Sequence, residues 1–273
     1  AWDQNNVSLK VDEAPVAVVL SRDGKRVTVM HVPSPLLSMQ SRHRAALTYP
    51  GVNGPETLEW EFTVGPYTKD LVASRIGVFT GGASFSSSGL GRTGQTGDSA
   101  VDFGMGTGPV RIADGSFLNT ASAGDEMTFA FWMKGYDNAN NSAFWAVAPS
   151  SPGGRGWQAH VPNGNIIYFD TAGCCDAATQ RINANIDTFL SYTGDVSWWQ
   201  DWHHFVFSKQ GEIKQVWIDG QLFLEGSNTA PLPSDFTELF LGSDASGAGV
   251  IHGLVDDFAV FGKALDEATI GQL

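Results

Sequence analysis

Short runs with an apolar residue at every second position constrain the fold of this chain more than any other feature. In LEWEFTV, every second residue from Leu58 to Val64 is apolar, so these side chains would share one face of a strand. Farther along, the Asp219-Gly220 pair separates two alternating runs and predicts a hairpin. With 32 glycines and only 16% charged residues, the chain is expected to be all-β with many turns.

The strand-like runs fall into two groups, which predict two domains. Residues 1–66 predict a small β-sandwich, and residues 67–82 predict a linker. Residues 83–273 carry longer and clearer runs, such as MTFAFWMK, NIIYFD and LVDDFAVF. Among these segments, ALDEATIGQL at the end of the chain is the one that predicts a short helix.

The formal charge of -13 bears on the class of partner. Nucleic-acid binding relies on clustered Lys and Arg, so nucleic acid is not an expected partner, whereas an acidic chain suits hard cations. No apolar run approaches the roughly 18–20 residues of a membrane span, so membrane insertion is not expected. The opening AWDQNNVSLK lacks the basic and apolar regions of a signal peptide.

Several motifs follow one another in an order and spacing that resemble a known family. They are SAVDFG, MTFAFWMKG, WHHFVFSKQGEIKQVWIDGQLF, LFLGS and GLVDDFAVFGKALDEATI. Over about residues 81–273 the chain resembles the laminin-G-like group of concanavalin A-like jelly rolls. VSLKVDEAPV and LEWEFTV resemble the immunoglobulin-like domains that precede such modules in large bacterial surface or secreted proteins. Ala1 would fall inside such a domain, so its first strand is expected to be missing.

The resemblance implies two antiparallel sheets packed face to face, with glycans or proteins bound on a concave face or at the rim. It also implies a structural calcium with Asp256 as its carboxylate ligand, completed by backbone carbonyls near Gly81–Gly91. Asp257 is expected to point to the opposite face of the strand and not to share the ion. Under the alternative interpretation, these acids cap a strand end or face solvent.

Catalytic patterns are not evident in the sequence. The Glu-x-Asp-x-x-Glu pattern of jelly-roll hydrolases does not occur, and neither do His-Glu-x-x-His or Gly-x-Ser-x-Gly. A glycosidase needs two carboxylates that face one bond, and such a pair can also be assembled from distant strands. A glycoside hydrolase or lyase therefore stays as a less favoured alternative.

Cys174 and Cys175, the only two cysteines, are neighbours in the sequence. Bridged cysteines usually have Cα atoms about 4.4–6.8 Å apart, whereas consecutive Cα atoms are fixed near ~3.8 Å, so a bridge between them closes a strained ring. The alternatives are two reduced core residues or bonds to another chain. The small polar flanks favour an exposed loop, and exposed thiols do not persist in an oxidising compartment. A vicinal disulfide is therefore the favoured interpretation.

The residues near the two cysteines suggest a ligand site. A sugar ring is apolar on one face and hydroxylated at its edge, which would match a flat disulfide beside hydrogen-bonding groups. The expected ligand-binding residues are Trp157, His160, Tyr168, Asp170, Cys174, Cys175, Asp176, Gln180 and Arg181. Two alternatives are a redox switch and a disulfide that only pins its loop.

Together, these features predict a noncatalytic carbohydrate-recognition or adhesion module of a secreted or cell-surface bacterial protein, stabilised by calcium. Its expected partner is an extracellular polysaccharide or glycoprotein. The leading alternative is a structural spacer or accessory domain of a larger enzyme or adhesin, with no ligand of its own. The sequence does not select a particular glycan or an oligomeric state.

Overall fold

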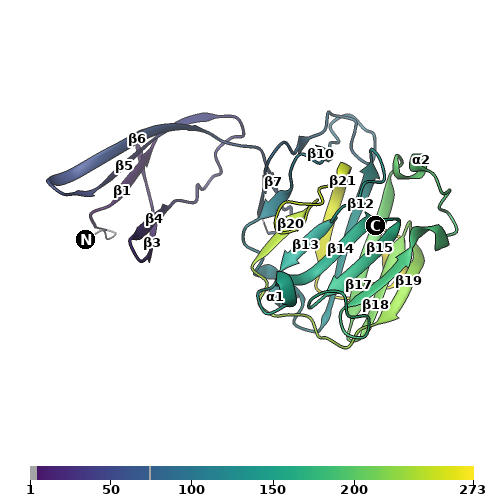
Figure 1. Cartoon of the computed structure of the whole chain (residues 1–273). Helices are drawn as coiled ribbons and strands as arrows, with labels where there is room; N and C mark the ends of the chain where they lie inside the picture. Colours follow the sequence, from purple (N-terminus) through teal and green to yellow (C-terminus); the bar gives the residue numbers. More distant parts are fainter. Residues whose placement is uncertain (1–4, 74) are drawn as a thin grey trace. The chain divides into compact units, whose positions relative to one another are not determined.

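The structure of the protein is a computed structural model that describes residues 5–73 and 75–273. The chain forms two compact units, Ala1–Tyr67 and Thr68–Leu273, and strands dominate both of them (Figure 1). No helix in the described ranges is long and apolar enough to cross a membrane. The all-β fold class predicted from the sequence is confirmed.

The first unit contains a four-stranded antiparallel sheet in the order β2-β1-β5-β6 and a separate β3-β4 hairpin. Its strands are β1 (Ser8–Val11), β2 (Ala14–Val16), β3 (Val19–Asp23), β4 (Arg26–Met30), β5 (Arg42–Gly51) and β6 (Gly54–Thr63). β6 confirms the strand expected at LEWEFTV, but Leu58 and Trp60 stay 54% and 40% exposed. The immunoglobulin-like character of this unit stays a prediction.

The second unit consists of two antiparallel sheets. The seven-stranded sheet has the order β19-β18-β17-β12-β21-β10-β9, and the eight-stranded sheet has the order β16-β15-β14-β13-β20-β11-β8-β7. The strands of the first are β9 (Ser84–Phe85), β10 (Val101–Met105), β12 (Glu126–Gly135), β17 (His203–Gln210), β18 (Ile213–Ile218), β19 (Gln221–Ser227) and β21 (His252–Phe261). Those of the second are β7 (Tyr67–Lys69), β8 (Ile76–Phe79), β11 (Val110–Ile112), β13 (Phe144–Val147), β14 (Arg155–Asn163), β15 (Ile166–Thr171), β16 (Arg181–Asn185) and β20 (Glu238–Leu241).

Short helices connect or flank these strands. They are α1 (Phe117–Ala121), η1 (Pro152–Gly154), η2 (Ile186–Thr188), α2 (Val196–Trp199) and α3 (Glu267–Ile270). α3 is the helix expected at the end of the chain, and the Asp266 side chain caps it by accepting from Thr269 N. Leu265 and Ile270 pack on the outside of the seven-stranded sheet, against a cluster that includes Trp217.

Aromatic side chains fill the space between the two sheets. Phe129 on β12 stacks on Trp157 of the opposite sheet, with 5.2 Å between ring centroids, and contacts Phe144 at 4.8 Å. All three side chains are fully buried, and burial of each contributes about 1.5–3 kcal/mol. The expected arrangement of two antiparallel sheets packed face to face is confirmed.

The segment expected to be a linker, residues 67–82, supplies two strands of the eight-stranded sheet. β8 pairs with β11, and Phe79 aligns with Val110. Phe79 is 6% exposed and belongs to the core. The second compact unit therefore begins at Thr68 and not at residue 83.

Candidate functional site

Alternation along four strands places a row of residues on the outer face of the eight-stranded sheet, the face away from the core. Cross-strand pairing aligns Trp145, Gln158, Asp170 and Arg181. The adjacent row faces the core and consists of Phe144, Ala159, Phe169 and Ile182. Successive strand residues point to opposite sides of a sheet, so the first row points outward.

Two arginines, Arg155 and Arg181, hold the carboxylate of Asp170, which is fully buried. Arg181 donates from Nε and Nη2 to its two oxygens, each at 2.6 Å, and Arg155 donates from Nη1 at 3.1 Å. The hydrogen bond to Asp170 raises the pKa of the Arg181 guanidinium above its usual value. Arg155, Asp170 and Arg181 form the group called the arginine cluster below.

Aromatic rings support both guanidinium groups of the arginine cluster. The Arg155 guanidinium lies over the Trp145 ring at 4.5 Å, and that of Arg181 lies over the Tyr168 ring at the same distance. Cation–π contacts of this kind contribute about 0.5–2 kcal/mol and fix the orientation of the charged plane. The two arginines are thus held in place before any ligand arrives.

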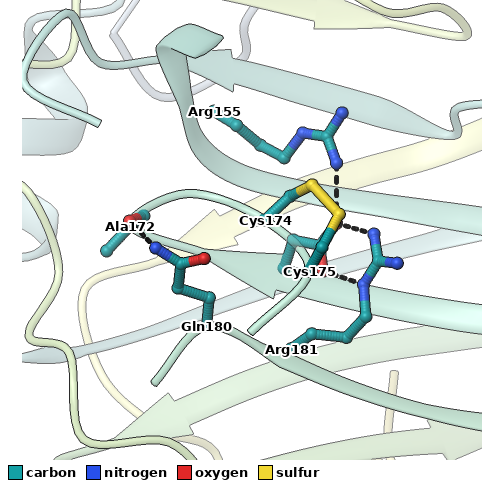
Figure 2. Close-up of a disulfide and its surroundings, with 7 residues drawn as sticks. Arg155, Ala172, Cys174, Cys175, Gln180 and Arg181 are labelled. Carbon is teal, nitrogen blue, oxygen red and sulfur yellow. Dashed lines mark hydrogen bonds and ion pairs between the residues drawn. A yellow bond between two sulfur atoms is a disulfide. The ribbon is translucent and has the colours of Figure 1, made fainter. Parts of the chain in front are cut away.

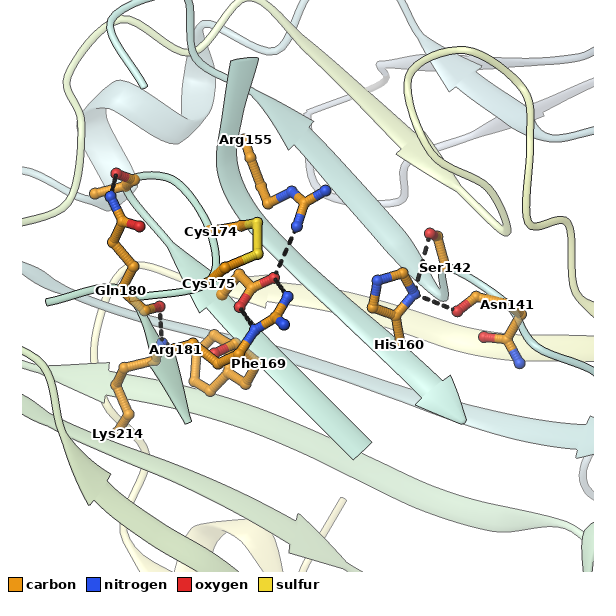
Figure 3. Close-up of polar contacts among 12 residues, drawn as sticks. Asn141, Ser142, Arg155, His160, Phe169, Cys174, Cys175, Gln180, Arg181 and Lys214 are labelled. Atoms are coloured by element: carbon orange, nitrogen blue, oxygen red, sulfur yellow. Dashed lines mark hydrogen bonds and ion pairs between the residues drawn. A yellow bond between two sulfur atoms is a disulfide. The ribbon is translucent and has the colours of Figure 1, made fainter. Parts of the chain in front are cut away.

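Cys174 and Cys175 form a vicinal disulfide next to this cluster. Both close-ups place the disulfide between Arg155 and Arg181 (Figures 2 and 3). Backbone bonds fix this position, because Gly173 N donates to Arg155 O at 2.7 Å. Cys174 is half-buried and Cys175 is exposed, with a positive φ of 84°. The disulfide favoured from the sequence is therefore present at the surface of the structure.

The rest of the cysteine loop, residues 172–180, is held by its own side chains. Asp176 Oδ1 accepts from Ala178 N and from both N and Oγ1 of Thr179. These bonds lower the pKa of the Asp176 carboxyl. Gln180 Nε2 donates to Ala172 O across the loop at 3.2 Å. Asp176 and Gln180, two of the expected ligand residues, thus shape the loop that carries the disulfide.

A buried lysine, Lys214, holds the end of the cysteine loop in place. Lys214 Nζ donates to Phe169 O at 2.8 Å and to Gln180 O at 2.9 Å (Figure 3). It also donates to Asn228 Oδ1 at 3.0 Å. Burial lowers the pKa of this ammonium well below its usual value, while the three acceptors match its three N–H donors. Lys214 was not among the expected site residues. The available signal was its spacing of two from the apolar Val216, which places both side chains on the same face of an alternating strand.

His160 and Tyr168 occupy the next outward row and face each other in register. Their rings meet edge to face with centroids 5.7 Å apart. His160 Nδ1 lies 2.6 Å from Asn141 O, and burial lowers the pKa of the imidazole. These two residues and the arginine cluster are therefore on the same face, as expected for a shared site.

Trp157 is the exception among the expected ligand residues. It is fully buried and stacks on Phe129 in the core. Its position three residues from His160 gives the two side chains opposite directions along β14, since strands alternate with a period of two. The assignment of Trp157 to the ligand site is therefore wrong.

Two residues of the outward row carry polar atoms that lack a protein partner. Both amide atoms of Gln158 and the indole Nε1 of Trp145 are buried without a hydrogen bond to any described residue. Arg155 contacts the neighbours of Gln158 on both sides, the Trp145 ring and the Asp170 carboxylate. Gln158 therefore lies in register between two residues that Arg155 contacts. Buried amides without partners are rare in proteins.

Asp256, the expected calcium ligand, lies in β21 against the glycine-rich loop. Arg92 N donates to Asp256 Oδ2 at 2.9 Å, and Arg92 Nε donates to Asp257 Oδ2 at 2.8 Å. The β12–β21 register shifts here, and Asp257 has a φ of 48°, which marks a β-bulge. Both acids therefore face the same loop, and the expectation that Asp257 points away is wrong.

The electrostatics at Asp256 suit a cation. Burial raises the pKa of its carboxyl, and the nearby charges of Asp257 and Asp98 raise it further against two backbone hydrogen bonds. Within the described ranges, no group of three His, Cys, Asp or Glu side chains could hold a metal ion. A cation at Asp256 would therefore rely on backbone carbonyls for most of its ligands.

Several solved structures are similar in fold to this chain. The receptor-binding domain of a botulinum neurotoxin C/D mosaic serotype has a TM-score of 0.50 and 11% identity, covering 76% of this chain and 49% of that chain. Domain 4 of an extracellular arabinanase from Geobacillus stearothermophilus, solved with arabinotriose, has a TM-score of 0.49 and 16% identity, covering 77% and 88%. The chain spans less than half of the toxin domains it matches.

No curated protein matches the sequence. The family model of the concanavalin A-like lectin/glucanases superfamily matches residues 104–271, which confirms the resemblance predicted for the second domain over that range. Because the match covers more than half of the sequence, this chain belongs to the concanavalin A-like lectin/glucanases superfamily.

Proposed function

We propose that this chain is a noncatalytic carbohydrate-recognition or adhesion module, and that its saccharide binds on the outer face of the eight-stranded sheet. The observation that carries the proposal is the exposed Cys174–Cys175 disulfide beside the arginine cluster. The disulfide offers a flat apolar surface and the guanidinium groups offer N–H donors, which together suit a sugar ring. The partner would be an extracellular polysaccharide or glycoprotein.

The state of the carboxylates at this face favours binding over catalysis. A glycosidase uses two carboxyl groups that flank the scissile bond. Asp170 is fully buried, and both of its oxygens accept from arginines. Asp170 is therefore not placed to exchange a proton with a saccharide. Asp176 directs Oδ1 into its own turn. The hydrogen bonds to Asp176 lower the pKa of its carboxyl, which disfavours the protonated form that a general acid needs.

Replacement of both cysteines by alanine tests the proposal. The ring spans only two residues, so we expect its loss to lower the free energy of unfolding by only about 1 kcal/mol. Saccharide binding on a glycan array should fall at least about tenfold, because the flat contact surface is lost. If the variant binds as the parent does, the disulfide only pins its loop. If the parent binds no glycan, the spacer alternative is favoured.

We also propose that a calcium ion binds at Asp256. Burial, and then the charges of Asp257 and Asp98, raise the pKa of the Asp256 carboxyl, and a divalent cation bound there would stabilise its charged form. The loop that contains Arg92 already lies against this carboxylate, and its backbone carbonyls are the nearest source of further ligands. Chelation should lower the melting temperature of the parent and leave that of Asp256→Asn unchanged. An unchanged melt of the parent after chelation would defeat the proposal.

We infer a secreted or cell-surface location in a bacterium, because vicinal disulfides persist in oxidising compartments. The first unit would then act as an immunoglobulin-like spacer. Its four-stranded sheet buries little, with Val7, Leu9 and Ala45 as its buried apolar residues among those described. Mass spectrometry after alkylation of unreduced, unfolded protein tests the redox state, because labelled thiols would contradict the location.

A further inference from the structure

We propose that the saccharide is acidic, and that its carboxylate or sulfate group binds Arg155 and Arg181. This inference rests on the proposed carbohydrate-binding function and names the class of saccharide. It follows from the charge of the arginine cluster, from its unused hydrogen-bond donors and from the buried amide of Gln158.

The arginine cluster carries a net positive charge, although the whole chain carries -13. Arg155 and Arg181 share the single carboxylate of Asp170. Asp176, an acid of the cysteine loop, directs Oδ1 into its own turn and forms no ion pair with either arginine in the described part of the chain. Within the arginine cluster, two guanidinium charges therefore meet one carboxylate, and one positive charge is left to attract an anion.

The two guanidinium groups also have donors to spare. Each carries five N–H groups, and in the described part of the chain Asp170 is their only acceptor. Arg155 Nε and Nη2 and Arg181 Nη1 thus remain without a protein acceptor. Planar forks of this kind match a carboxylate or sulfate through paired hydrogen bonds. The Trp145 and Tyr168 rings hold the forks in place, which lowers the ordering cost of binding.

Gln158 is an independent observation that points to a ligand. Its amide is fully buried, carries no hydrogen bond to any residue that the structure describes, and lies in the outward row between Trp145 and Asp170. Arg155 contacts the residues on both sides of Gln158, and it reaches Asp170 by a single bond of 3.1 Å. A small shift of the Arg155 guanidinium toward a bound anion, still over the Trp145 ring, would give the amide a saccharide hydroxyl as partner. This contact satisfies a group that the free protein leaves unpaired.

Matched polysaccharides test the inference by isothermal titration calorimetry with the full chain. One pair is polygalacturonate and its carboxyl-reduced, neutral form. The other is carrageenan and its desulfated form. We expect the acidic member of one pair to bind at least about tenfold more tightly than its neutral partner, because hydrogen bonds to a charged group contribute at least this much to the affinity. The pair that shows the difference identifies carboxylate or sulfate as the anion, and added salt should weaken this binding.

Arginine variants locate the anion. Arg155→Gln and Arg181→Gln should each reduce the preference for the acidic saccharide at least about tenfold. Arg155→Lys keeps the charge without the planar fork, so it should keep part of this preference, and it replaces Arg155→Gln as the test if that variant folds poorly. Arg92→Gln is the matched control, because Arg92 also pairs with an acid, Asp257, and lies over an aromatic ring, Trp132, but at the other sheet. It should keep the full preference.

Three results would overturn the inference. Equal or tighter binding of neutral saccharides would refute the acidic class and leave the carbohydrate-binding function standing. An acidic preference that survives both glutamine variants would place the anion elsewhere. Binding of no saccharide, in these pairs or on a neutral glycan array, would defeat both the inference and the proposed function.

Discussion

Asp170 holds both arginines of the outer face and has no contact with solvent. Asp170→Asn leaves two guanidinium charges without a counterion in a partly buried place. We expect the free energy of unfolding to fall by about 3 kcal/mol, as for a buried ion pair that loses one partner. Urea unfolding of both proteins measures this difference.

Glu238→Gln provides the control for that measurement. Glu238 pairs with Arg111, and both side chains keep substantial contact with water. Exposed pairs contribute little, so the expected loss is less than about 1 kcal/mol. Equal losses in the two variants would show that Asp170 does no more than an ordinary surface acid.

His204 makes stability depend on pH. It is buried, stacks on Trp132 with ring centroids 5.0 Å apart, and burial lowers its pKa to about 4. In the unfolded chain its pKa is about 6.5. The unfolded state therefore binds a proton first as pH falls. The stability that this group contributes is complete above pH 6.5 and is lost as pH falls toward 4, by up to about 3 kcal/mol.

His204→Phe isolates this effect, because phenylalanine keeps a ring against Trp132 and does not titrate. The free energy of unfolding should fall less steeply in the variant than in the parent between pH 6.5 and 4. Urea unfolding at several pH values in this window gives both slopes. Parallel slopes would mean that His204 takes up its proton in the native protein as readily as in the unfolded one.

Individual residues show how far the sequence predicts the site. The small polar residues beside Cys174 and Cys175 led to the disulfide, because they indicated an exposed loop in which free thiols would not persist. His160 and Tyr168 fall on one face, but Trp157 was assigned against the period of its own strand. Arg155 and Gln158 were missed, since their role depends on the pairing register of four strands, which a single sequence does not contain.

At the scale of elements, the cysteine loop depends on β18 through Lys214. Lys214→Met removes the donor for Phe169 O, Gln180 O and Asn228 Oδ1. Unsatisfied buried acceptors should lower the free energy of unfolding by about 2 kcal/mol. Hydrogen exchange at the amides of residues 172–181 should become faster, because the loop loses its anchor.

Lys209→Met is the matched control for the loop. Lys209 is equally buried, but its ammonium contacts Asp125 and Gly211 O, which belong to a different turn. This variant should also lose stability while exchange in residues 172–181 stays as in the parent. Faster loop exchange in both variants would indicate general loosening and not a specific anchor.

Elements whose signal is local were predictable. Asp219 and Gly220 have φ values of 50° and 73°, the positive angles that a two-residue hairpin requires, so this prediction is confirmed. The bulge at Asp257 was not predictable. It arises where the register between β12 and β21 shifts, and this shift turns both Asp256 and Asp257 toward one loop.

At the scale of the whole molecule, the two units differ in how much they bury. The second unit has a continuous aromatic core between its sheets, whereas the first buries only a few side chains among the residues described. The composition of residues 67–82 predicted a linker, yet the core of the second unit includes Phe79 from this segment. A strand of four residues carries too short a pattern to stand out in the sequence.

Two truncations test the boundary and the independence of the second unit. A chain that starts at Gly65 keeps β7 and β8, so its saccharide affinity should match that of the full chain within about twofold. A chain that starts at Ala83 loses both strands. The loss of Phe79 alone should then cost about 1.5–3 kcal/mol, and β11 would become an open edge that favours aggregation. Thermal melting and size-exclusion chromatography distinguish the two chains. Identical melting curves would show that the second unit begins at residue 83 and not at Thr68.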